Sequence, residues 1–246
     1  MALFDSLKRD IDAVLARDPA VRSRAEVVFC YPGFRAVRRH RRAHRAYEKG
    51  HFFWARLISA RTKRLTGIDI HPGAQIGEGL FIDHGTGVVI GETAVLGKNV
   101  TLYQGVTLGG TGKDTGKRHP TLGDDVVVGA GAKVLGPITL GNHVKVGAGA
   151  VVLKDVPAQC TVVGNPGRIV RGPGGRPEID LNHGDLPDPM LDKIQGVYAR
   201  LVQLEQMLSS HAVRLGCQEC PLSDCPDRST TIEAEKSPAR DEHKEA

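Results

Sequence analysis

Histidine and aspartate stand close together twice within a glycine-rich stretch of the chain, residues 67–92. Asp69 and His71 occur in DIHPG, and Asp83 and His84 occur in DHGTG. Histidine takes up and releases a proton near neutral pH, and a carboxylate beside it holds the ring in one tautomer. Such a pair can remove the proton of a hydroxyl group as its oxygen attacks a thioester. The residue types therefore favour His84 as a general base that activates an alcohol, with Asp69 as its carboxylate partner.

The segments that must position these residues carry an aliphatic side chain at every sixth position. An α-helix cannot keep a six-residue stripe on one face, and a plain strand would alternate with period two. This period predicts a mainly β fold, a left-handed parallel β-helix in which three hexads form one coil and the stacked coils bury an apolar column. Glycine directly follows eight stripe residues, which suits corners whose backbone angles a Cβ would forbid. The stripe comprises Ile70, Ile76, Ile82 and Val88, then, after a two-residue slip, Ile90, Leu96, Leu102 and Leu108, and, after a gap, Leu122, Val128, Val134, Leu140, Val146 and Val152.

A coil of three hexads places the two histidine phrases on adjacent coils. Asp69 lies fifteen residues before His84, three short of a full coil, so we expect the two side chains to approach each other. His71 precedes a proline at a coil corner, and a structural role fits this position as well as contact with a substrate does. His143 lies among Asn and Lys of a later repeat and should be exposed.

The remainder of the chain divides around the predicted β-helix. A basic cluster runs from Arg35 to Arg45 without interleaved aromatic residues, so we interpret it as a solvated helix face or a subunit contact and expect no nucleic acid partner.

The segment GGTGKDTGKRHPT interrupts the stripe and should form a mobile, functional loop rather than a tolerated insertion. The predicted parts are residues 1–66 (helical domain), 67–170 (β-helix catalytic domain with loop 109–121), 171–189 (linker), 190–215 (C-terminal helix) and 216–246 (largely disordered tail).

The C-terminal part raises two further possibilities. Apolar residues from Met190 to Leu208 alternate in steps of four and three, which suits either a short coiled coil or packing against the chain's own β-helix. Cys217, Cys220 and Cys225 form C-x2-C-x4-C, and with His211 they could ligate zinc or remain free thiols.

Composition excludes several classes of protein. Thirty glycines stand against six Phe, four Tyr and one Trp, so large aromatic residues cannot fill the core. A charged N-terminus, the lack of a long apolar run and an odd number of cysteines, five, favour the cytoplasm over export or a membrane. No Gly-Lys-Ser/Thr motif supports a kinase, and no βαβ unit supports a dehydrogenase.

Longer phrases of the sequence resemble one family. DIHPGAQIG, IDHGTGVVIGETAVLG and VTLGGTGKDTGKRHPTLGDDVVVGAGAKVLG, together with ARDPA, RRAHRAYEKG and VVGNPGRIV, are similar to the serine O-acetyltransferases of the hexapeptide-repeat acyltransferase family, over roughly residues 10–170. The resemblance implies transfer of acetyl from acetyl-CoA, a co-substrate and not a bound cofactor, to the hydroxyl of L-serine, the committed step of cysteine synthesis. Cys30 and Cys160 lie away from the Asp–His phrases, so we expect direct transfer without an acetyl-enzyme.

The resemblance also assigns residues to the substrates. It gives His84 and Asp69 to catalysis, Asp18 and Asp83 to the amine of serine, and Arg118 and His119 to its carboxylate, for which the planar fork of arginine is suited. It places acetyl-CoA in a groove between neighbouring β-helices and so implies a homotrimer. The residues of this chain available to acetyl-CoA there are Gly110, Ala130, Lys145, Lys154 and Arg168.

Alternatives and departures from the family stay open at this point. Another hexapeptide-repeat O-acyltransferase would share the hexads. A carbonic anhydrase of this fold would hold zinc with histidines contributed across a subunit interface, here His71, His84 and His119. A rigid trimeric scaffold would show neither thioester turnover nor serine binding. We favour the acyltransferase and expect no metal. The short helical region favours a trimer over a hexamer. The end HKEA lacks the C-terminal Ile with which family members dock to O-acetylserine sulfhydrylase, so that complex is not expected.

Overall fold

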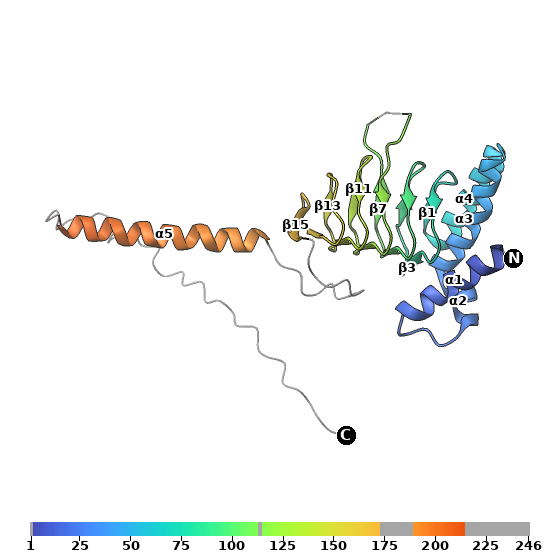
Figure 1. Cartoon of the computed structure of the whole chain (residues 1–246), viewed down its shortest axis with the longest axis horizontal. Helices are drawn as coiled ribbons and strands as arrows, with labels where there is room; N and C mark the ends of the chain where they lie inside the picture. The colour runs from blue at the N-terminus through green and yellow to red at the C-terminus, as the bar shows by residue number, and fades with distance from the viewer. Residues whose placement is uncertain (1, 113–114, 173–188, 215–246) are drawn as a thin grey trace, which may run out of the picture. The chain divides into compact units, whose positions relative to one another are not determined.

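The computed structural model describes residues 2–112, 115–172 and 189–214. Within the first compact unit, which ends at Leu191, four helices precede a parallel β-helix, and a fifth helix leads into the second unit (Figure 1). The predicted linker is described only at its two ends, and the predicted tail lies outside the described residues, with Cys217, Cys220 and Cys225. Among the described helices, none is long and apolar enough to cross a membrane.

The helices before the β-helix begin and end where local sequence dictates. They are α1 (Ala2–Arg17), α2 (Arg24–Cys30), α3 (Pro32–Glu48) and α4 (Phe52–Thr66). The helix α1 stops directly before Asp18-Pro19, since proline disfavours helical angles in the residue before it. The short helix α2 was not predicted, because seven residues are too few to show a periodic stripe; the Ser23 side chain caps it by accepting a hydrogen bond from the Glu26 amide.

Fifteen short strands build the β-helix. They are β1 (Asp69–Ile70), β2 (Gln75–Ile76), β3 (Phe81–Ile82), β4 (Val89–Ile90), β5 (Val95–Leu96), β6 (Thr101–Leu102), β7 (Thr107–Gly109), β8 (Thr121–Leu122), β9 (Val127–Val128), β10 (Lys133–Leu135), β11 (Thr139–Leu140), β12 (Lys145–Val146), β13 (Val151–Val152), β14 (Thr161–Val163) and β15 (Arg168–Arg171). Every third strand pairs in parallel to give three faces: sheet A (β1-β4-β7-β10-β13), sheet B (β11-β8-β5-β2) and sheet C (β15-β14-β12-β9-β6-β3). Only β14 and β15 pair antiparallel among the described strands. The predicted parallel β-helix is confirmed.

The predicted stripe lies in the core of the β-helix. All fourteen of its residues belong to the core cluster, with Ile76 partly buried and the others buried. The sequence reading missed a second inward stripe two positions earlier on each face, which includes Ile68 and Val100. Val88 was predicted as the member of the first stripe that follows Ile82. It belongs to the second stripe, because it lies two residues before Ile90. Each face therefore buries two residues and not one.

The apparent slip in the stripe marks a longer corner. Asp69 pairs with Val89, 20 residues on, whereas Val89 pairs with Thr107, 18 residues on. The two additional residues lie in the corner between β3 and β4, residues 83–88, which contains Asp83 and His84.

Glycine after the stripe serves close stacking of coils rather than unusual backbone angles. A Cβ on Gly77 would lie 2.4 Å from the Gly97 carbonyl oxygen of the next coil. None of the eight glycines that follow the stripe has a positive φ. The predicted reason for these glycines was therefore wrong, because contact between backbones of adjacent coils excludes the side chain.

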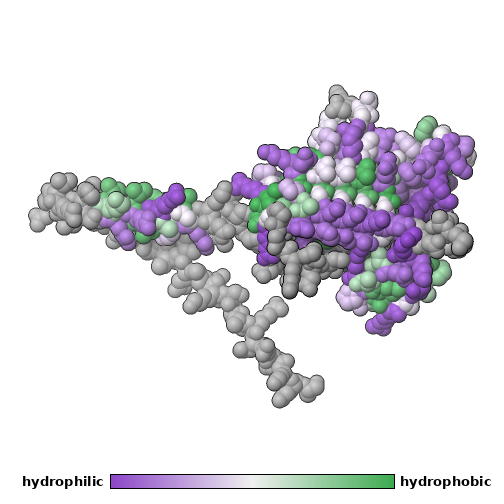
Figure 2. Space-filling model, in the orientation of Figure 1, coloured by the Kyte–Doolittle hydropathy of each residue, from purple (hydrophilic) through white to green (hydrophobic). Residues whose placement is uncertain are grey.

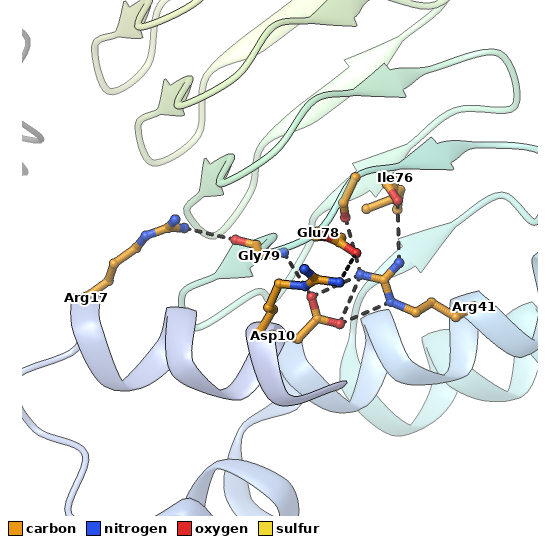
Figure 3. Close-up of polar contacts among 8 residues, drawn as sticks. Asp10, Arg17, Arg41, Ile76, Glu78 and Gly79 are labelled. Carbon is orange, nitrogen blue, oxygen red and sulfur yellow. Dashed lines mark hydrogen bonds and ion pairs between the residues drawn. The ribbon is translucent and has the colours of Figure 1, made fainter. Parts of the chain in front are cut away.

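The helical region covers the first coil through a buried ion pair (Figure 3). Arg41 donates to both carboxylate oxygens of Asp10 at 2.9 Å, and Asp10 also accepts from the Gly79 amide of the first coil at 3.0 Å. Burial raises the pKa of Asp10, and the Arg41 charge opposes that rise. The α3 backbone comes so close that a Cβ on Gly33 would lie 2.2 Å from the Ile82 carbonyl oxygen. The solvated face or subunit contact expected for the basic cluster was therefore wrong at Arg41, which holds the helices on the β-helix.

Replacing Asp10 with asparagine should lower the free energy of unfolding by about 3 kcal/mol, because it leaves Arg41 in a partly buried site without its countercharge. The matched control is Asp12→Asn, which removes the Asp12–Arg24 pair, whose side chains are 45% and 62% exposed. That pair should contribute less than about 1 kcal/mol. Chemical denaturation of both variants tests this difference, and equal losses would contradict the role given to Asp10.

Candidate active site

The corners at the two ends of sheet A hold the candidate residues. The turns before its strands, residues 83–88, 103–106, 129–132 and 147–150, are called the upstream corner. The turns after its strands, residues 71–74, 91–94, 110–120 and 136–138 with the segment after β13, are called the downstream corner. In one chain a face of the β-helix separates the two corners.

Tyr31 of the helical region interacts with carboxylates of that region and with Asp83 of the upstream corner. The Tyr31 hydroxyl donates to Asp18 Oδ2 at 2.5 Å, and the other oxygen of Asp18 accepts from the Ala20 amide at 2.8 Å. Burial, the hydrogen bond to Asp18 and the nearby charges of Glu26 and Asp83 together raise the pKa of Tyr31, so the phenol stays a donor. Asp18 and Asp83, both predicted to bind an amine, thus both act on the pKa of Tyr31, Asp18 through a hydrogen bond and Asp83 through its charge.

His84 directly follows Asp83 and has an unusual backbone conformation. Its φ is 55°, in the left-handed region that favours glycine, and its side chain is exposed. A non-glycine residue held there costs conformational energy, and such residues concentrate at functional sites. The corner thus presents the imidazole to solvent, next to Asp83.

Asp69 has a partner other than His84. Its carboxylate forms a 2.8 Å ion pair with Lys63 at the end of α4. Both Asp69 and His84 lie in the described part of the chain, which shows no hydrogen bond between them. The predicted fifteen-residue spacing assumed an eighteen-residue coil, whereas the first coil has 20 residues, so His84 lies five positions before Val89, the residue that pairs with Asp69.

The downstream corner holds Arg118 and His119 through two consecutive residues. The Thr93 hydroxyl accepts from the amides of Arg118 and His119 at 3.0 and 3.1 Å. The Glu92 carboxylate accepts from the Arg118 guanidinium at 2.5 Å and from the Tyr47 hydroxyl at 3.0 Å. The Arg118 hydrogen bond is the main reason that the pKa of Glu92 lies below its usual value. The base of the loop is therefore fixed, although the loop itself projects from the β-helix (Figure 1).

The ring of His119 is buried with a defined proton position. Its Nδ1 accepts from the Thr93 amide at 3.2 Å, which leaves Nε2 to carry the proton of the neutral ring. Burial and the Arg118 charge lower the pKa of His119, so the ring is neutral at pH 7. The ring occupies the space beside Gly91, where a Cβ would lie 1.8 Å from it. His119 can thus donate one hydrogen bond from Nε2.

The other histidines do not join His84. His71 lies at the downstream corner, where its Nδ1 accepts from the Gly73 amide at 3.0 Å and closes the turn. A zinc site built from His71, His84 and His119 would span both corners, so one chain does not assemble it. Among the residues that the structure describes, no three His, Cys, Asp or Glu side chains are placed to hold a metal ion. His143 is exposed on a different corner.

The residues predicted to contact acetyl-CoA also divide between the corners. Ala130 lies in the upstream corner, and Lys145 and Arg168 lie on strands β12 and β15 of sheet C, which leads into it. Gly110 and Lys154 follow β7 and β13 at the downstream corner. The residues predicted to bind serine divide in the same way, with Asp83 in the upstream corner and Arg118 and His119 in the downstream corner.

A row of glycines runs along the upstream corner. Gly87, Gly105, Gly131 and Gly149 occupy successive coils with φ between 67° and 77°. On the corner between sheets B and C, the same left-handed conformation is held by other residues, namely Asn99, Asp125, His143 and Gln159. The backbone angle alone therefore does not require glycine. These four positions instead form a row without side chains of its own, along which the Lys133 ammonium donates to the carbonyls of Gly105 and Gly131 at 3.1 and 2.8 Å.

Sequence reasoning missed four residues, two in the downstream corner and two in the helical region. Glu92 and Thr93 stand in a GETA turn that looks like any other corner of the repeat, and their role depends on contact with a loop some 25 positions away. Tyr31 and Tyr47 lie in the helical region, where a tyrosine within an amphipathic pattern gives no signal of contact with a distant corner.

Comparison with known proteins identifies the family. The profile described as bacterial transferase hexapeptide (six repeats) matches residues 119–154. A serine acetyltransferase from Synechocystis sp. is 52% identical over 229 residues, which cover 90% of this chain and 92% of the relative. The chain belongs to the serine acetyltransferases. It is therefore an acyltransferase dependent on acetyl-CoA, and the predicted family is confirmed.

Solved serine acetyltransferases share the fold. The structure from Neisseria gonorrhoeae in complex with serine is 44% identical, with a TM-score of 0.67 over 69% of each chain. The structure from Brucella abortus in complex with coenzyme A is 47% identical, with a TM-score of 0.68 over 70% of this chain and 69% of that one. The left-handed form of the β-helix is thereby confirmed for this serine acetyltransferase.

Proposed function

We propose that this chain transfers the acetyl group of acetyl-CoA to the hydroxyl of L-serine in the cytoplasm, giving O-acetyl-L-serine and CoA as the first step of cysteine biosynthesis. Family membership supports the reaction class. The observation that carries the mechanism is the upstream corner, where exposed His84 directly follows Asp83 in a left-handed backbone conformation.

His84 acts as the general base in this mechanism. It takes the proton of the serine hydroxyl as the oxygen attacks the thioester carbonyl, and it returns the proton to the sulfur of CoA when the carbon–sulfur bond breaks. The acetyl group passes directly to serine, and no acetyl-enzyme forms. Cys160 is buried in the core of the β-helix, and Cys30 lies at the exposed end of α2, which agrees with a direct transfer.

Asp69 stabilises the imidazolium of His84 once it leaves Lys63. The Lys63–Asp69 pair is 60% and 32% exposed, and an exposed ion pair contributes less than about 1 kcal/mol. Asp69 can therefore leave Lys63 for the imidazolium of His84 at little cost in free energy. The carboxylate then fixes the ring in the tautomer that accepts the proton.

The ammonium and the carboxylate of serine bind at different corners in this mechanism. Asp18 and Asp83 bind the ammonium group beside His84, while Arg118 and the Nε2–H of His119 bind the carboxylate. Serine is far too small to reach from one corner of a chain to the other. We therefore place the downstream corner of a neighbouring chain against the upstream corner, so that each site uses two chains and a cyclic homotrimer has three sites.

Glu92 and Thr93 position the carboxylate-binding residues in this arrangement. Thr93 fixes the backbone of Arg118 and His119, and Glu92 directs the guanidinium. Tyr47 holds Glu92 from the helical region, so α3 supports a site that lies on the β-helix.

The pantetheine arm of acetyl-CoA lies along the glycine row of the upstream corner. An arm without strong charges can lie close to a row of glycines, and the carbonyls of Gly105 and Gly131 in this row already accept from Lys133. Lys145 and Arg168 supply positive charge toward the phosphates, and Ala130 supplies backbone. Gly110 and Lys154 approach the same ligand from the downstream corner of the neighbouring chain.

Gly131→Asn should raise the KM for acetyl-CoA by about tenfold while the KM for serine changes little, since the new side chain blocks the pantetheine path at a cost of roughly 1–3 kcal/mol. A Cβ at Gly131 meets nothing within 4 Å, and asparagine tolerates its φ of 68°. Gly50→Asn is the control, because Gly50 also has an open site and a positive φ but lies outside the β-helix. Steady-state kinetics with both substrates gives the answer, and an equal change in the two KM values would argue against the path.

The function as a whole is tested with purified protein, acetyl-CoA and a panel of amino acids that includes serine, threonine and homoserine, with thiol release as the signal. Serine should be the best acceptor, and mass spectrometry should find O-acetylserine. Thiol release that does not depend on serine, or a better acceptor in the panel, would refute the proposal.

A further inference from the structure

The helix α5 (Pro189–Arg214) exposes a regular apolar stripe (Figure 2). The stripe residues are each between 52% and 64% exposed, and they alternate in steps of three and four. This is the a/d pattern by which helices associate in coiled coils. The stripe comprises Ile194, Val197, Leu201, Leu204 and Leu208.

Charged residues beside the stripe define the direction of association. With Ile194, Leu201 and Leu208 at position a, Arg200 falls at position g and Glu205 at the following position e. Residues five apart do not face each other on one helix, since neighbours on a helix lie three or four apart. In parallel helices in register, however, position g of one helix faces the following position e of the next. Arg200 and Glu205 are complementary in that arrangement alone.

An antiparallel arrangement would oppose like charges. It would bring positions g together, where the sequence places Lys193 and Arg200, and positions e together, where it places Glu205. Cyclic symmetry also orients identical helices in the same direction around its axis. Charge pattern and symmetry therefore agree on a parallel bundle of identical helices.

We propose that α5 binds the α5 helices of neighbouring copies of this chain in a parallel coiled coil in register. The number of helices, three, rests on the trimer in the proposed function; the direction and the register rest on the stripe and its charges. The coiled coil would add a second contact between the chains and would hold the two-chain sites together at low protein concentration.

The first test follows amide hydrogen exchange over residues 194–208 in the full-length protein. We expect protection in the native protein and its loss by at least about a hundredfold in Leu201→Asp, which buries one carboxylate from each helix in the central layer of the apolar seam. The control is Ala199→Asp, at the outer position f, which should keep the protection. An unprotected segment in the native protein, or equal effects of the two substitutions, would overturn the proposal.

The second test separates association between copies from packing on the same chain. Arg200→Glu and Glu205→Arg should each lose protection, because each places like charges opposite each other, and the double variant should regain it. Mixing the two single variants by coexpression should also restore it in part. A helix packed on its own β-helix would show no such rescue, and that result would refute the coiled coil. Acetyl transfer, assayed at high protein concentration, should persist in every variant; its loss in all proteins would count against the proposed function instead.

Discussion

His84→Ala should lower kcat by at least about a hundredfold, since general-base catalysis contributes typically 10²–10⁴-fold. The hydroxyl of serine would then have to lose its proton to water while it attacks the thioester. Because the His84 side chain is exposed at the upstream corner and fills no part of the core, the oligomer and the free energy of unfolding should change little. Stopped assays of thiol release at saturating substrates give the ratio of kcat values.

The structure provides a matched control for this experiment. His143 is also exposed and also has a left-handed backbone, with φ of 58° against 55° for His84, but it lies on another corner of the β-helix. His143→Ala therefore imposes the same backbone strain without removing a catalytic group, and it should keep full turnover. A well-folded His84→Ala protein with near-native kcat would show that His84 is not the general base.

The fold could be predicted from the sequence because the aliphatic stripe repeats on every coil. Each face of each coil must turn an aliphatic residue inward, so all fourteen predicted positions hold aliphatic residues of the core, although Val88 belongs to the second stripe. The second inward stripe was overlooked since residues such as Ala74 and Ala94 are small and do not stand out from the glycine-rich corners. The tight stacking of Gly77 on Gly97 was equally invisible, because it depends on the distance between coils.

Placement of the site was harder to predict than its chemistry. Residue types favoured His84 as the base and the family resemblance assigned Arg118, but a period alone does not say which corner a residue occupies once the repeat is interrupted. Two additional residues before β4 shift His84, and a long loop carries Arg118 to the opposite end of sheet A. Contacts between distant segments, such as Arg41 with Asp10 and Arg118 with Glu92, leave no periodic signal at all.

Arg118→Ala should raise the KM for serine by about ten- to a hundredfold and that for acetyl-CoA much less, since a hydrogen bond to a charged group contributes roughly 1.5–3 kcal/mol. Arg118 is held by Glu92 and by Thr93, so the loss concerns a guanidinium that is already directed and not a freely moving one. At serine concentrations below the native KM, this variant and His84→Ala should both be nearly inactive.

Coexpression of these two variants then tests where the site lies. In a cyclic trimer whose sites combine the upstream corner of one chain with the downstream corner of the next, an equal mixture should restore about a quarter of the sites, because each needs one chain of each kind in the right order. Such a site takes His84 from the chain that lacks Arg118, and Arg118 from the chain that lacks His84. If both residues served serine within one chain, every site in the mixture would lack one of them and activity would stay at the level of the separate variants. Recovery of activity therefore requires two chains per site, whereas its absence would mean that the loop folds back onto the upstream corner of its own chain.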